Sequence, residues 1–540
     1  MRSKQEADVR GRDSWLSIAA FLGVVCLGVV CLAACSADEP RQTVATPPQQ
    51  PSILFVTLDT TRADRLGFES DSFETPHLDA LAARGVHFSQ AYSTVPMTLP
   101  AHASMFTGLY PADHGIHENG RYVSEDHGLL ASRLRESGYR TAAFVSGYPL
   151  SRQFGLARGF DHFDDDFAGG VERRASTTTD RALAYLPESV DEPLFLWVHY
   201  FDPHEPYDPP EPFASRYPAD SYQGEIAFMD EELGRLLARF EEHQSDGDVR
   251  IIVVGDHGES LGEHGEALHG KLLYQGVMRV PLVVAGTGIE PGRIDRPVSS
   301  RQAFDTILGW ADGADSPGWM EESDEPVLGE ALKPYLQYGW QPQVMGVTGT
   351  LKVIRSGETE VYDVVADPAE AHDLVGEVEI GRTLLEAIRD YPVIPESASG
   401  EHAEGGKALS EEAVRKLASL GYFDSGPGHG ERENAPNPKD MTHIFRDLDV
   451  GSALFIRQEY ETAIPVFSRV LAEDPENLVV SLRLAVAHSV LGHEKEAQGF
   501  FERSRDISPE SIDLRHYHAM HYFRFDQWEQ AKPLFESVLA

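Results

Sequence analysis

The first long apolar run of the chain and the polar turn behind it lie in residues 52–67, SILFVTLDTTRADRLG. Residues 53–58 carry no charge, and a continuous run of this length is typical of a strand that is buried on both faces. Asp59 follows it directly. Four more such runs lie at residues 141–145, 194–198, 251–254 and 281–285. Residues 52–67 are therefore predicted to open a buried sheet, with a carboxylate at the end of its first strand.

The segments between these runs have helical periodicity, which is clearest at residues 78–84, 129–137, 178–186 and 225–240. Strands that alternate with helices predict an α/β sheet with helices on both faces. In such folds ligands bind at the carboxyl ends of the strands, where Asp59 and Asp256 are expected. A smaller α+β part should follow, with paired strands at residues 344–354 and 359–364 and a helix at residues 409–420.

The charge of the 540-residue chain excludes some partners. It has 87 acidic and 46 basic residues, a formal net charge of -41, while its 41% hydrophobic and 25% charged residues are usual for a folded soluble protein. Such a surface repels phosphate backbones, so we expect no nucleic-acid partner. A small anionic group would need a metal ion or a local cluster of cations to bind here.

The N-terminus has the layout of a signal peptide, predicted over residues 1–35. Four basic residues lie within the first 12, and an apolar run at residues 18–33 is short for a membrane-spanning helix. Leu32-Ala33-Ala34-Cys35 resembles a bacterial lipobox, in which the cysteine is lipidated. We therefore expect export and a lipid anchor on a bacterial membrane; the alternative is an uncleaved membrane anchor, which also leaves the domains outside the cytoplasm.

The three cysteines all lie in this N-terminal segment, at positions 26, 31 and 35. After cleavage only a lipidated one would remain, which excludes a disulfide, a zinc-thiolate site or a cysteine nucleophile. Residues 36–50 are expected to form a linker. The main α/β domain is predicted at residues 51–320 and its smaller C-terminal part at 321–423. A second linker, rich in Gly, Pro and Asn, is predicted at 424–440.

A repeat of 34 residues occupies residues 441–540. Its marks are an alanine (Ala463, Ala497, Ala531), a phenylalanine four residues later, and a proline at Pro475 and Pro509. This pattern resembles the tetratricopeptide repeat, an all-α helical array that binds protein partners. The third unit stops at Ala540 without a capping helix, so we expect a truncated chain. We also expect the repeat not to contribute to the catalytic centre.

Three stretches resemble the motifs of one enzyme family. They are LDTTRADRLG at residues 58–67, TLPAHASMFTGLYP at residues 98–111, and GDHGE at residues 255–259 with His264, His269 and Lys271 downstream. In this order they resemble the sulfatase branch of the alkaline phosphatase superfamily, over about residues 52–420. The resemblance implies an alkaline-phosphatase-like sheet and a hydrolase of sulfate or phosphate esters.

Thr98 stands where a sulfatase has the Cys or Ser that becomes formylglycine. Threonine cannot give that aldehyde, so we expect its hydroxyl to attack directly, as in phosphoethanolamine transferases and some phosphonate ester hydrolases. A metal must favour its alkoxide, since a free alcohol is a poor nucleophile. Pro100 suits a first helical turn, which would place Thr98 beside free N–H groups. The alternative is that Thr98 only caps this helix.

The resemblance gives Asp59, Thr98, Asp256 and His257 as the metal ligands. Sulfatases that bind calcium have a second Asp where this chain has Thr60, and often an Asn or Gln where it has His257. Imidazole in place of an oxygen ligand favours manganese or zinc, although calcium stays possible.

Other candidates surround these ligands. His102 replaces the arginine that follows the sulfatase nucleophile, and is expected to bond the nucleophile or a substrate oxygen. His204, in PHEPY, would bind substrate or act as general acid, and Lys271 would counter charge on the transferred group. His269 is a substrate-binding candidate. His264 is a further candidate for the site, and Asp202 is a candidate ligand of a second metal ion. Arg62 and Arg65 are expected to bind substrate or to form ion pairs.

We therefore predict an exported, metal-dependent hydrolase of sulfate, phosphate or phosphonate esters. Its substrate would be a small anionic ester or a sulfated or phosphorylated glycan or lipid. The absence of formylglycine favours phosphate or phosphonate. Two alternatives stay open: a transferase, in which an alcohol replaces water in the second step, and a non-catalytic module that binds glycans or proteins.

Overall fold

The computed structural model describes residues 50–186, 192–243, 247–393, 410–420, 432 and 434–539. The predicted signal peptide, and most residues of the two predicted linkers, lie outside this range. None of the described helices has the length and the apolar character that a membrane crossing requires.

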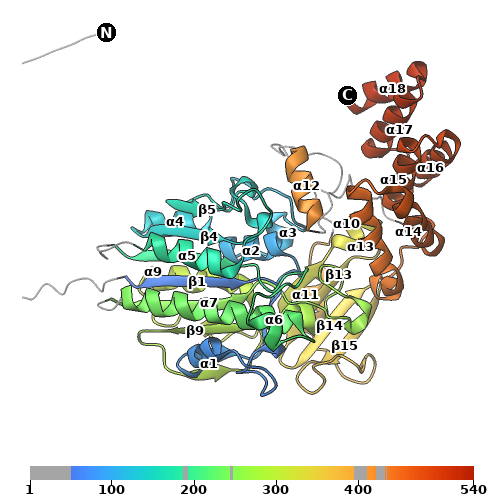
Figure 1. The fold of residues 1–540 in the computed structure, drawn as a ribbon. Helices are drawn as coiled ribbons and strands as arrows, with labels where there is room; N and C mark the ends of the chain where they lie inside the picture. The colour runs from blue at the N-terminus through green and yellow to red at the C-terminus, as the bar shows by residue number, and fades with distance from the viewer. Residues whose placement is uncertain are drawn as a thin grey trace, which may run out of the picture. The chain divides into compact units, whose positions relative to one another are not determined.

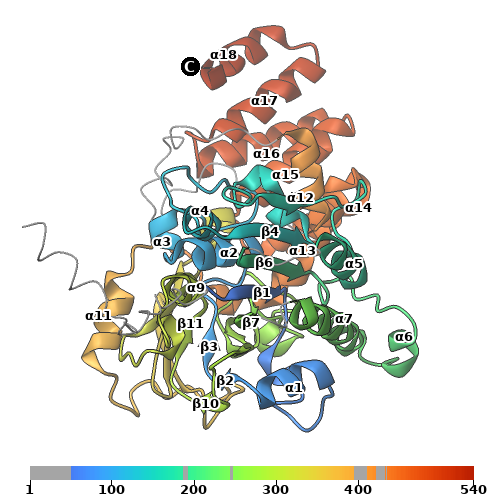
Figure 2. The ribbon, with the colours of Figure 1, turned by 90° about the vertical axis from the view of Figure 1, so that its left-hand side faces the viewer.

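An eight-stranded sheet forms the centre of the main domain (Figures 1 and 2). β1 lies between β6 and β7 and is parallel to both, while β9 is antiparallel to β7. Because β1 and β7 are parallel neighbours, their carboxyl ends lie at the same edge of the sheet. In spatial order the strands are β10 (Gly292–Ile294), β2 (Val86–Phe88), β9 (Leu282–Gly286), β7 (Val249–Gly255), β1 (Ser52–Leu58), β6 (Leu194–Tyr200), β4 (Arg140–Val145) and β5 (His162–Asp164).

Helices cover both faces of this sheet, as Figure 2 shows end-on. Ile53 and Phe55 of β1 pack in one core, with α2, α4 and α9 on that face, whereas Leu54 and Val56 pack in a second core with α1, α5 and α7. All four side chains are fully buried. The predicted α/β fold is thus confirmed. The helices are α2 (Thr98–Thr107), α4 (Leu130–Glu136), α9 (Ala303–Ala311), α1 (Pro76–Ala83), α5 (Ala175–Tyr185) and α7 (Ser221–His243).

A second, four-stranded antiparallel sheet forms the smaller subdomain, in the order β12, β13, β14, β15. The single strand predicted at residues 344–354 is wrong, because a hairpin divides it where Thr348 pairs with Leu351. Gly349, in the turn, has φ +59, a conformation that glycine adopts without strain. The strands are β12 (Val327–Ala331), β13 (Gln343–Thr348), β14 (Leu351–Ser356) and β15 (Glu358–Asp363); a small third sheet holds β3 (Ala91–Tyr92), β8 (Arg279–Val280) and β11 (Val298–Ser299).

Three helix pairs form the C-terminal repeat. Ala463, Ala497 and Ala531 are buried in the second helix of each pair, and Phe467 and Phe501 are fully buried one turn later. The predicted 34-residue period therefore corresponds to one helix pair. The helices are α13 (Thr442–Ile456), α14 (Tyr460–Glu473), α15 (Leu478–Val490), α16 (Glu494–Ile507), α17 (Ile512–Arg524) and α18 (Trp528–Leu539).

The first repeat helix packs against the hydrolase-like part of the chain. One buried cluster joins Leu272, Tyr338 and Trp340 with Phe445 and Leu448 of α13. The backbone before α13 also takes part, since the N–H of Gln341 donates to the Pro436 carbonyl at 3.0 Å. The first helix of the repeat therefore shares a buried core with the part of the chain that precedes it.

Candidate active site

Two carboxylates meet at the shared edge of β1 and β7. Leu58 pairs with Gly255 across these strands, so the next residues, Asp59 and Asp256, lie side by side. The N–H of Asp256 donates to the Leu58 carbonyl at 3.1 Å, and both aspartates are fully buried. Burial raises the pKa of Asp59, and it raises that of Asp256 further with the help of the Asp59 charge. Two buried carboxylates this close need a cation to be stable in ionised form.

Four buried side-chain atoms from this region have no hydrogen-bond partner: Oδ1 of Asp59, Oγ1 of Thr98, Oδ2 of Asp256 and Nε2 of His257. Nε2 of His257 is 3.8 Å from the Asp59 oxygen and 3.7 Å from the Asp256 oxygen. The other ring nitrogen donates to the Gly258 carbonyl at 3.0 Å, so Nε2 carries a lone pair. Unpaired buried acceptors are costly unless they bind a cation. These four residues fit a divalent metal ion.

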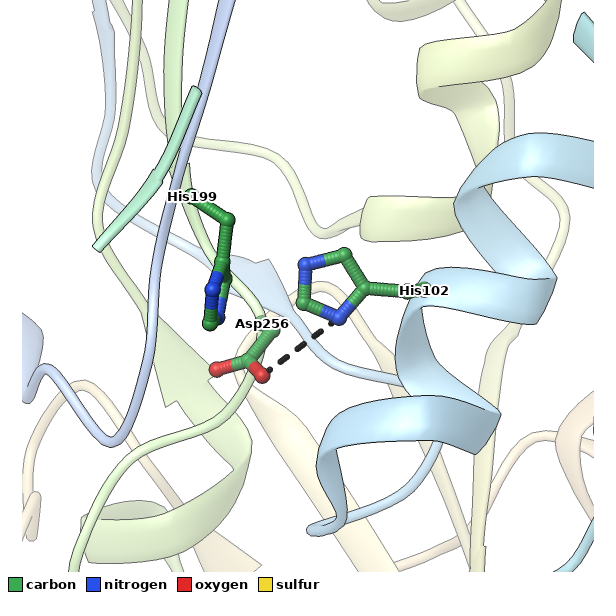
Figure 3. A group of neighbouring side chains, drawn as sticks. All are labelled: His102, His199 and Asp256. Carbon is green, nitrogen blue, oxygen red and sulfur yellow. Dashed lines mark ion pairs between the residues drawn. The ribbon is translucent and has the colours of Figure 1, made fainter. Parts of the chain in front are cut away.

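A second group of possible ligands, His102, His199 and Asp256, lies beside the first. Figure 3 shows the two rings and the carboxylate close together, with Nδ1 of His102 3.6 Å from Asp256. Nδ1–H of His102 donates to the Thr98 carbonyl at 2.7 Å, and Nε2 accepts from the Thr57 hydroxyl at 2.9 Å. Both nitrogens are thus engaged. His102 thus bonds the main chain of Thr98, the predicted nucleophile, and burial lowers the pKa of His102.

His199 is hydrogen-bonded to Asp59, one of the four possible metal ligands. Its Nδ1 accepts from the Ser146 N–H at 3.3 Å, and its Nε2–H donates to Oδ2 of Asp59 at 3.2 Å. Burial lowers the pKa of His199 to about 3, so the ring is neutral and keeps this tautomer. Hydrogen bonds of this kind orient the carboxylates that bind metals. The sequence signal for His199 is its place near the end of the apolar run that forms β6.

Thr98 is the first residue of α2. The sequence predicted free N–H groups beside it, at the N-terminal end of this helix, but two of these groups are hydrogen-bonded. The N–H of Leu99 donates to Oδ1 of Asn119 at 2.8 Å, and the N–H of Ala101 donates to the Met97 carbonyl at 3.0 Å. These two N–H groups are therefore not free. Nδ2 of Asn119 is instead buried without a hydrogen-bond partner. Asn119 is a donor beside Thr98 that sequence reasoning missed, because no motif we used includes it.

His204 and His269 lie next to His257. The ring centroid of His269 is 4.5 Å from that of His257 and 5.4 Å from that of His204. Burial lowers the pKa of His204 to about 4, and burial with the charges of Lys333 and Lys271 lowers that of His269 to about 3. Both predicted substrate-binding histidines thus stand beside the possible metal ligands as neutral rings.

Glu259 fixes His269 in place. Its carboxylate bonds Nδ1 of His269 at 3.0 Å and accepts from the Tyr207 hydroxyl at 3.0 Å. It is fully buried, which raises its pKa. Glu259 belongs to the GDHGE motif, but the sequence analysis gave it no role in the site. Its position three residues after Asp256 is the signal that indicates one.

The remaining candidates have other partners. Lys271 is paired with Asp449 of the repeat, and half-buried His264 stacks on Tyr274 with ring centroids 3.6 Å apart. Asp202 accepts from the N–H of Ala175 at 2.8 Å, which gives it a role at the start of α5. The two arginines form ion pairs, Arg62 with Asp64 and Glu263, and Arg65 with Asp220.

Comparison with known proteins agrees with this arrangement. Residues 51–314 match the sulfatase family model, and residues 454–521 match a tetratricopeptide repeat. Residues 51–314 form a sulfatase domain. The uncharacterized sulfatase YidJ of Escherichia coli is 23% identical over 437 residues, which cover 64% of this chain and 87% of that protein. The choline-sulfatase of Rhizobium meliloti is 24% identical over 446 residues, covering 63% and 86%.

A solved structure shows the same fold. The phosphonate monoester hydrolase of Silicibacter pomeroyi has a TM-score of 0.51 at 21% identity, covering 67% of this chain and 99% of that one. The predicted resemblance to sulfatases is confirmed for residues 51–314, and the predicted tetratricopeptide repeat is confirmed for residues 454–521. The sulfatase domain is thus a sulfatase-like ester hydrolase, with side chains that could hold a metal ion.

Proposed function

We propose that this sulfatase domain is a metal-dependent hydrolase that uses Thr98 as its nucleophile. The observation that carries the proposal is the convergence of four unpartnered buried atoms, on Asp59, Thr98, Asp256 and His257. Thr98 is the one hydroxyl among them. A hydroxyl with no hydrogen-bond partner, among ligands for a cation, suits a nucleophile better than a helix cap, whose oxygen would accept a backbone N–H.

The donor set favours manganese or zinc over calcium. It combines two carboxylates, a hydroxyl and one imidazole, and imidazole is a ligand that calcium seldom takes. Thr60, where calcium-binding sulfatases have an aspartate, donates its hydroxyl to the Pro203 carbonyl. A divalent cation held here would stabilise negative charge on the Thr98 oxygen and on the bound ester.

The residues of this chain then have separate tasks. The Thr98 hydroxyl gives up its proton to solvent, Oγ1 attacks phosphorus or sulfur, the bond to the leaving alcohol oxygen breaks, and that oxygen takes a proton from protonated His204. An anionic ester bound against His204 raises the pKa of the ring, because negative charge favours imidazolium. Water then attacks the threonine ester and gives one proton back to His204, the bond to Oγ1 breaks, and the Thr98 oxygen takes up a proton from solvent. Nδ2 of Asn119 is the donor for a developing oxyanion.

The substrate is a sulfate, phosphate or phosphonate ester. The choline-sulfatase relative supports a sulfate ester, whereas the lack of a formylglycine precursor at position 98 favours phosphate or phosphonate, because threonine offers no aldehyde route for sulfate release. A glycan or lipid that bears such a group is the natural substrate class we propose.

A substrate panel tests the proposal. The full chain, Thr98→Ala and Thr98→Ser are assayed on an aryl sulfate, a phosphate monoester, a phosphate diester and a phosphonate, with manganese, zinc or calcium. We expect turnover of at least one ester by the wild type, a loss of at least about 10³-fold in Thr98→Ala, and partial activity in Thr98→Ser. Turnover by Thr98→Ala within about tenfold of wild type contradicts the nucleophile. Added alcohols show whether product is hydrolysed or transferred.

The cellular location of the protein is proposed from the sequence alone. We propose that Cys35 is lipidated and anchors the exported protein to a bacterial membrane, since Leu32-Ala33-Ala34-Cys35 resembles a lipobox. A fatty-acid analogue should label the wild type and not Cys35→Ala. Unlabelled wild type that keeps Met1 contradicts the lipid anchor and supports an uncleaved membrane anchor.

A further inference from the structure

Lys271 receives its charge partner from the repeat. Its side chain is 3% exposed, and its Nζ lies 3.1 Å from both carboxylate oxygens of Asp449 in α13. The ammonium also lies 5.3 Å from the ring centroid of Phe445, one helical turn before Asp449. A buried ammonium needs such a partner to be stable, and Asp449 is the carboxylate in direct contact with Nζ, while the charge of Glu266 also acts on it.

Glu266 of the sulfatase domain and Gln343 of the smaller subdomain hold the backbone of the same residue. The Glu266 carboxylate accepts from the N–H of Lys271 at 2.8 Å and from that of Leu272 at 3.2 Å. The Gln343 side chain donates to the Lys271 carbonyl. One part of the chain thus fixes the main chain of Lys271, and another fixes its charged end.

The repeat helix that carries Asp449 is itself firmly docked. The Trp340 ring stacks on Phe445 with centroids 6.0 Å apart, and its Nε1–H donates to Asp474 at 2.7 Å. Gly265, in the loop before Lys271, lies against Thr442 so closely that a Cβ there would be 2.7 Å from the threonine side chain. These contacts keep α13 in a defined position beside the loop that carries His269 and Lys271.

Lys271 is joined to the candidate active site by a short segment of chain. It follows His269 by only two residues, and the Glu259 carboxylate bonds Nδ1 of His269 at 3.0 Å. His269 is in turn next to His257, a proposed metal ligand. A change in the position or charge of Lys271 therefore alters the surroundings of His269 and, next to it, of His257.

We infer that Asp449 is a positioning residue of the active site, which the repeat module supplies in order to hold the Lys271 ammonium near His269. Asp449 itself does not touch the substrate; it acts through Lys271. The inference rests on the proposed function, because it requires that Lys271 serve the reaction. It also makes the first helix pair of the repeat a necessary part of the enzyme.

Asp449→Asn in the full chain tests this inference, because amide replaces carboxylate at nearly constant volume. The matched control is Asp447→Asn in the same helix, which breaks the ion pair with Arg469 at 2.7 Å inside the repeat. The side chain of Asp449 is 36% exposed, so we expect the variant to fold, as circular dichroism and bound metal would show. Asp449→Glu keeps the charge and serves as the rescue variant.

We expect Asp449→Asn to lower kcat/KM about tenfold, while Asp447→Asn stays near wild type and Asp449→Glu recovers much of the loss. Asp449 raises the pKa of Lys271, so its removal lets the ammonium lose its proton at lower pH. The alkaline limb of the pH profile should therefore move to lower pH. In a Lys271→Met background, Asp449→Asn should cause no further loss.

Kinetics of Asp449→Asn that equal those of Asp447→Asn would overturn the inference, and so would an independent loss in the Lys271→Met background. Failure of the proposed function has a different result. If Thr98→Ala remains active, the proposed function is wrong. If Thr98→Ala is inactive but Asp449→Asn is fully active, only the role of Asp449 is rejected.

Discussion

The Nε2–H of His199 donates to Oδ2 of Asp59 at 3.2 Å, which leaves Oδ1 of the same carboxylate 3.8 Å from Nε2 of His257. Oδ2 of Asp59 is thus hydrogen-bonded to His199, and Oδ1 is left to bind the proposed metal ion. Since both side chains are fully buried, water cannot replace this hydrogen bond.

His199→Ala should therefore weaken metal binding by about 10- to 100-fold, because Asp59 loses the partner that orients it. Metal titration followed by elemental analysis measures the effect. His87→Gln is the control, since His87 is a buried histidine that pairs with Glu69 away from the site. An unchanged dissociation constant in His199→Ala would show that Asp59 is held without it.

Removal of a ligand should remove the metal. Asp256→Ala and His257→Ala should each lower metal content well below that of wild type, and a chelator should inactivate the wild type reversibly. Asp202→Asn should retain full metal content, because Asp202 bonds the N–H of Ala175. Full activity in protein shown to be free of metal would reject the metal mechanism, and metal lost from Asp202→Asn would indicate a second ion.

The Asn119 side chain has two roles that substitutions can separate. Its Oδ1 accepts from the Leu99 N–H, and its Nδ2 is the proposed donor to the oxyanion. Asn119→Asp keeps the acceptor for the Leu99 N–H but loses the Nδ2 donor, whereas Asn119→Ala loses both. If Nδ2 stabilises the oxyanion, both variants should lower kcat by about 10²-fold with metal content unchanged. A normal kcat in Asn119→Asp would assign the side chain to the start of α2 alone.

Glu259 should affect the reaction through His269. Glu259→Ala removes the partner of Nδ1, so we expect kcat to fall by about tenfold or more as the ring loses its orientation. Tyr207→Phe removes only the second hydrogen bond to the same carboxylate and should have a small effect. Equal kinetics for the two variants would contradict a specific role for His269.

Truncation tests the contribution of the repeat. A chain that ends near Asp424 lacks Asp449 and exposes the apolar surface around Trp340, which α13 covers. We expect it to be less soluble and, where it folds, to hydrolyse a small aryl ester more slowly than the full chain. Full-length activity in this shortened protein, with metal bound, would mean that the repeat serves only to bind partners.

The sequence predicted the parts of the fold whose signals are local. Buried strands such as β1 show as continuous apolar runs, and carboxylates at the ends of parallel strands are adjacent whenever the strands are neighbours. The hairpin at Gly349 was missed because its turn, Gly349-Thr350, interrupts the apolar pattern only briefly. Such turns depend on backbone conformation more than on composition.

Long-range side-chain partners were harder to predict. The bond from His102 to the Thr98 carbonyl follows from helix geometry and was within reach of the sequence. The pair between Lys271 and Asp449 was not, because no periodicity relates residues that far apart. Motifs identified the proposed ligands, whereas their supporting partners became visible only in three dimensions.

The contacts of Asp474 have a consequence for how the chain unfolds. This buried carboxylate, between α14 and α15, accepts from Trp340 at 2.7 Å and from Arg432 at 2.7 Å. It therefore joins the start of the helical array to the smaller subdomain, which carries Trp340, so we expect these two parts to melt in one cooperative transition. The last pair, α17 and α18, lies at the other end of the array, and Trp528 at the start of α18 is exposed. Helical arrays lose stability repeat by repeat. The array should thus fray from its far end while the enzyme and the adjoining helices stay folded, and hydrogen exchange would show this as a gradient of protection along the repeats.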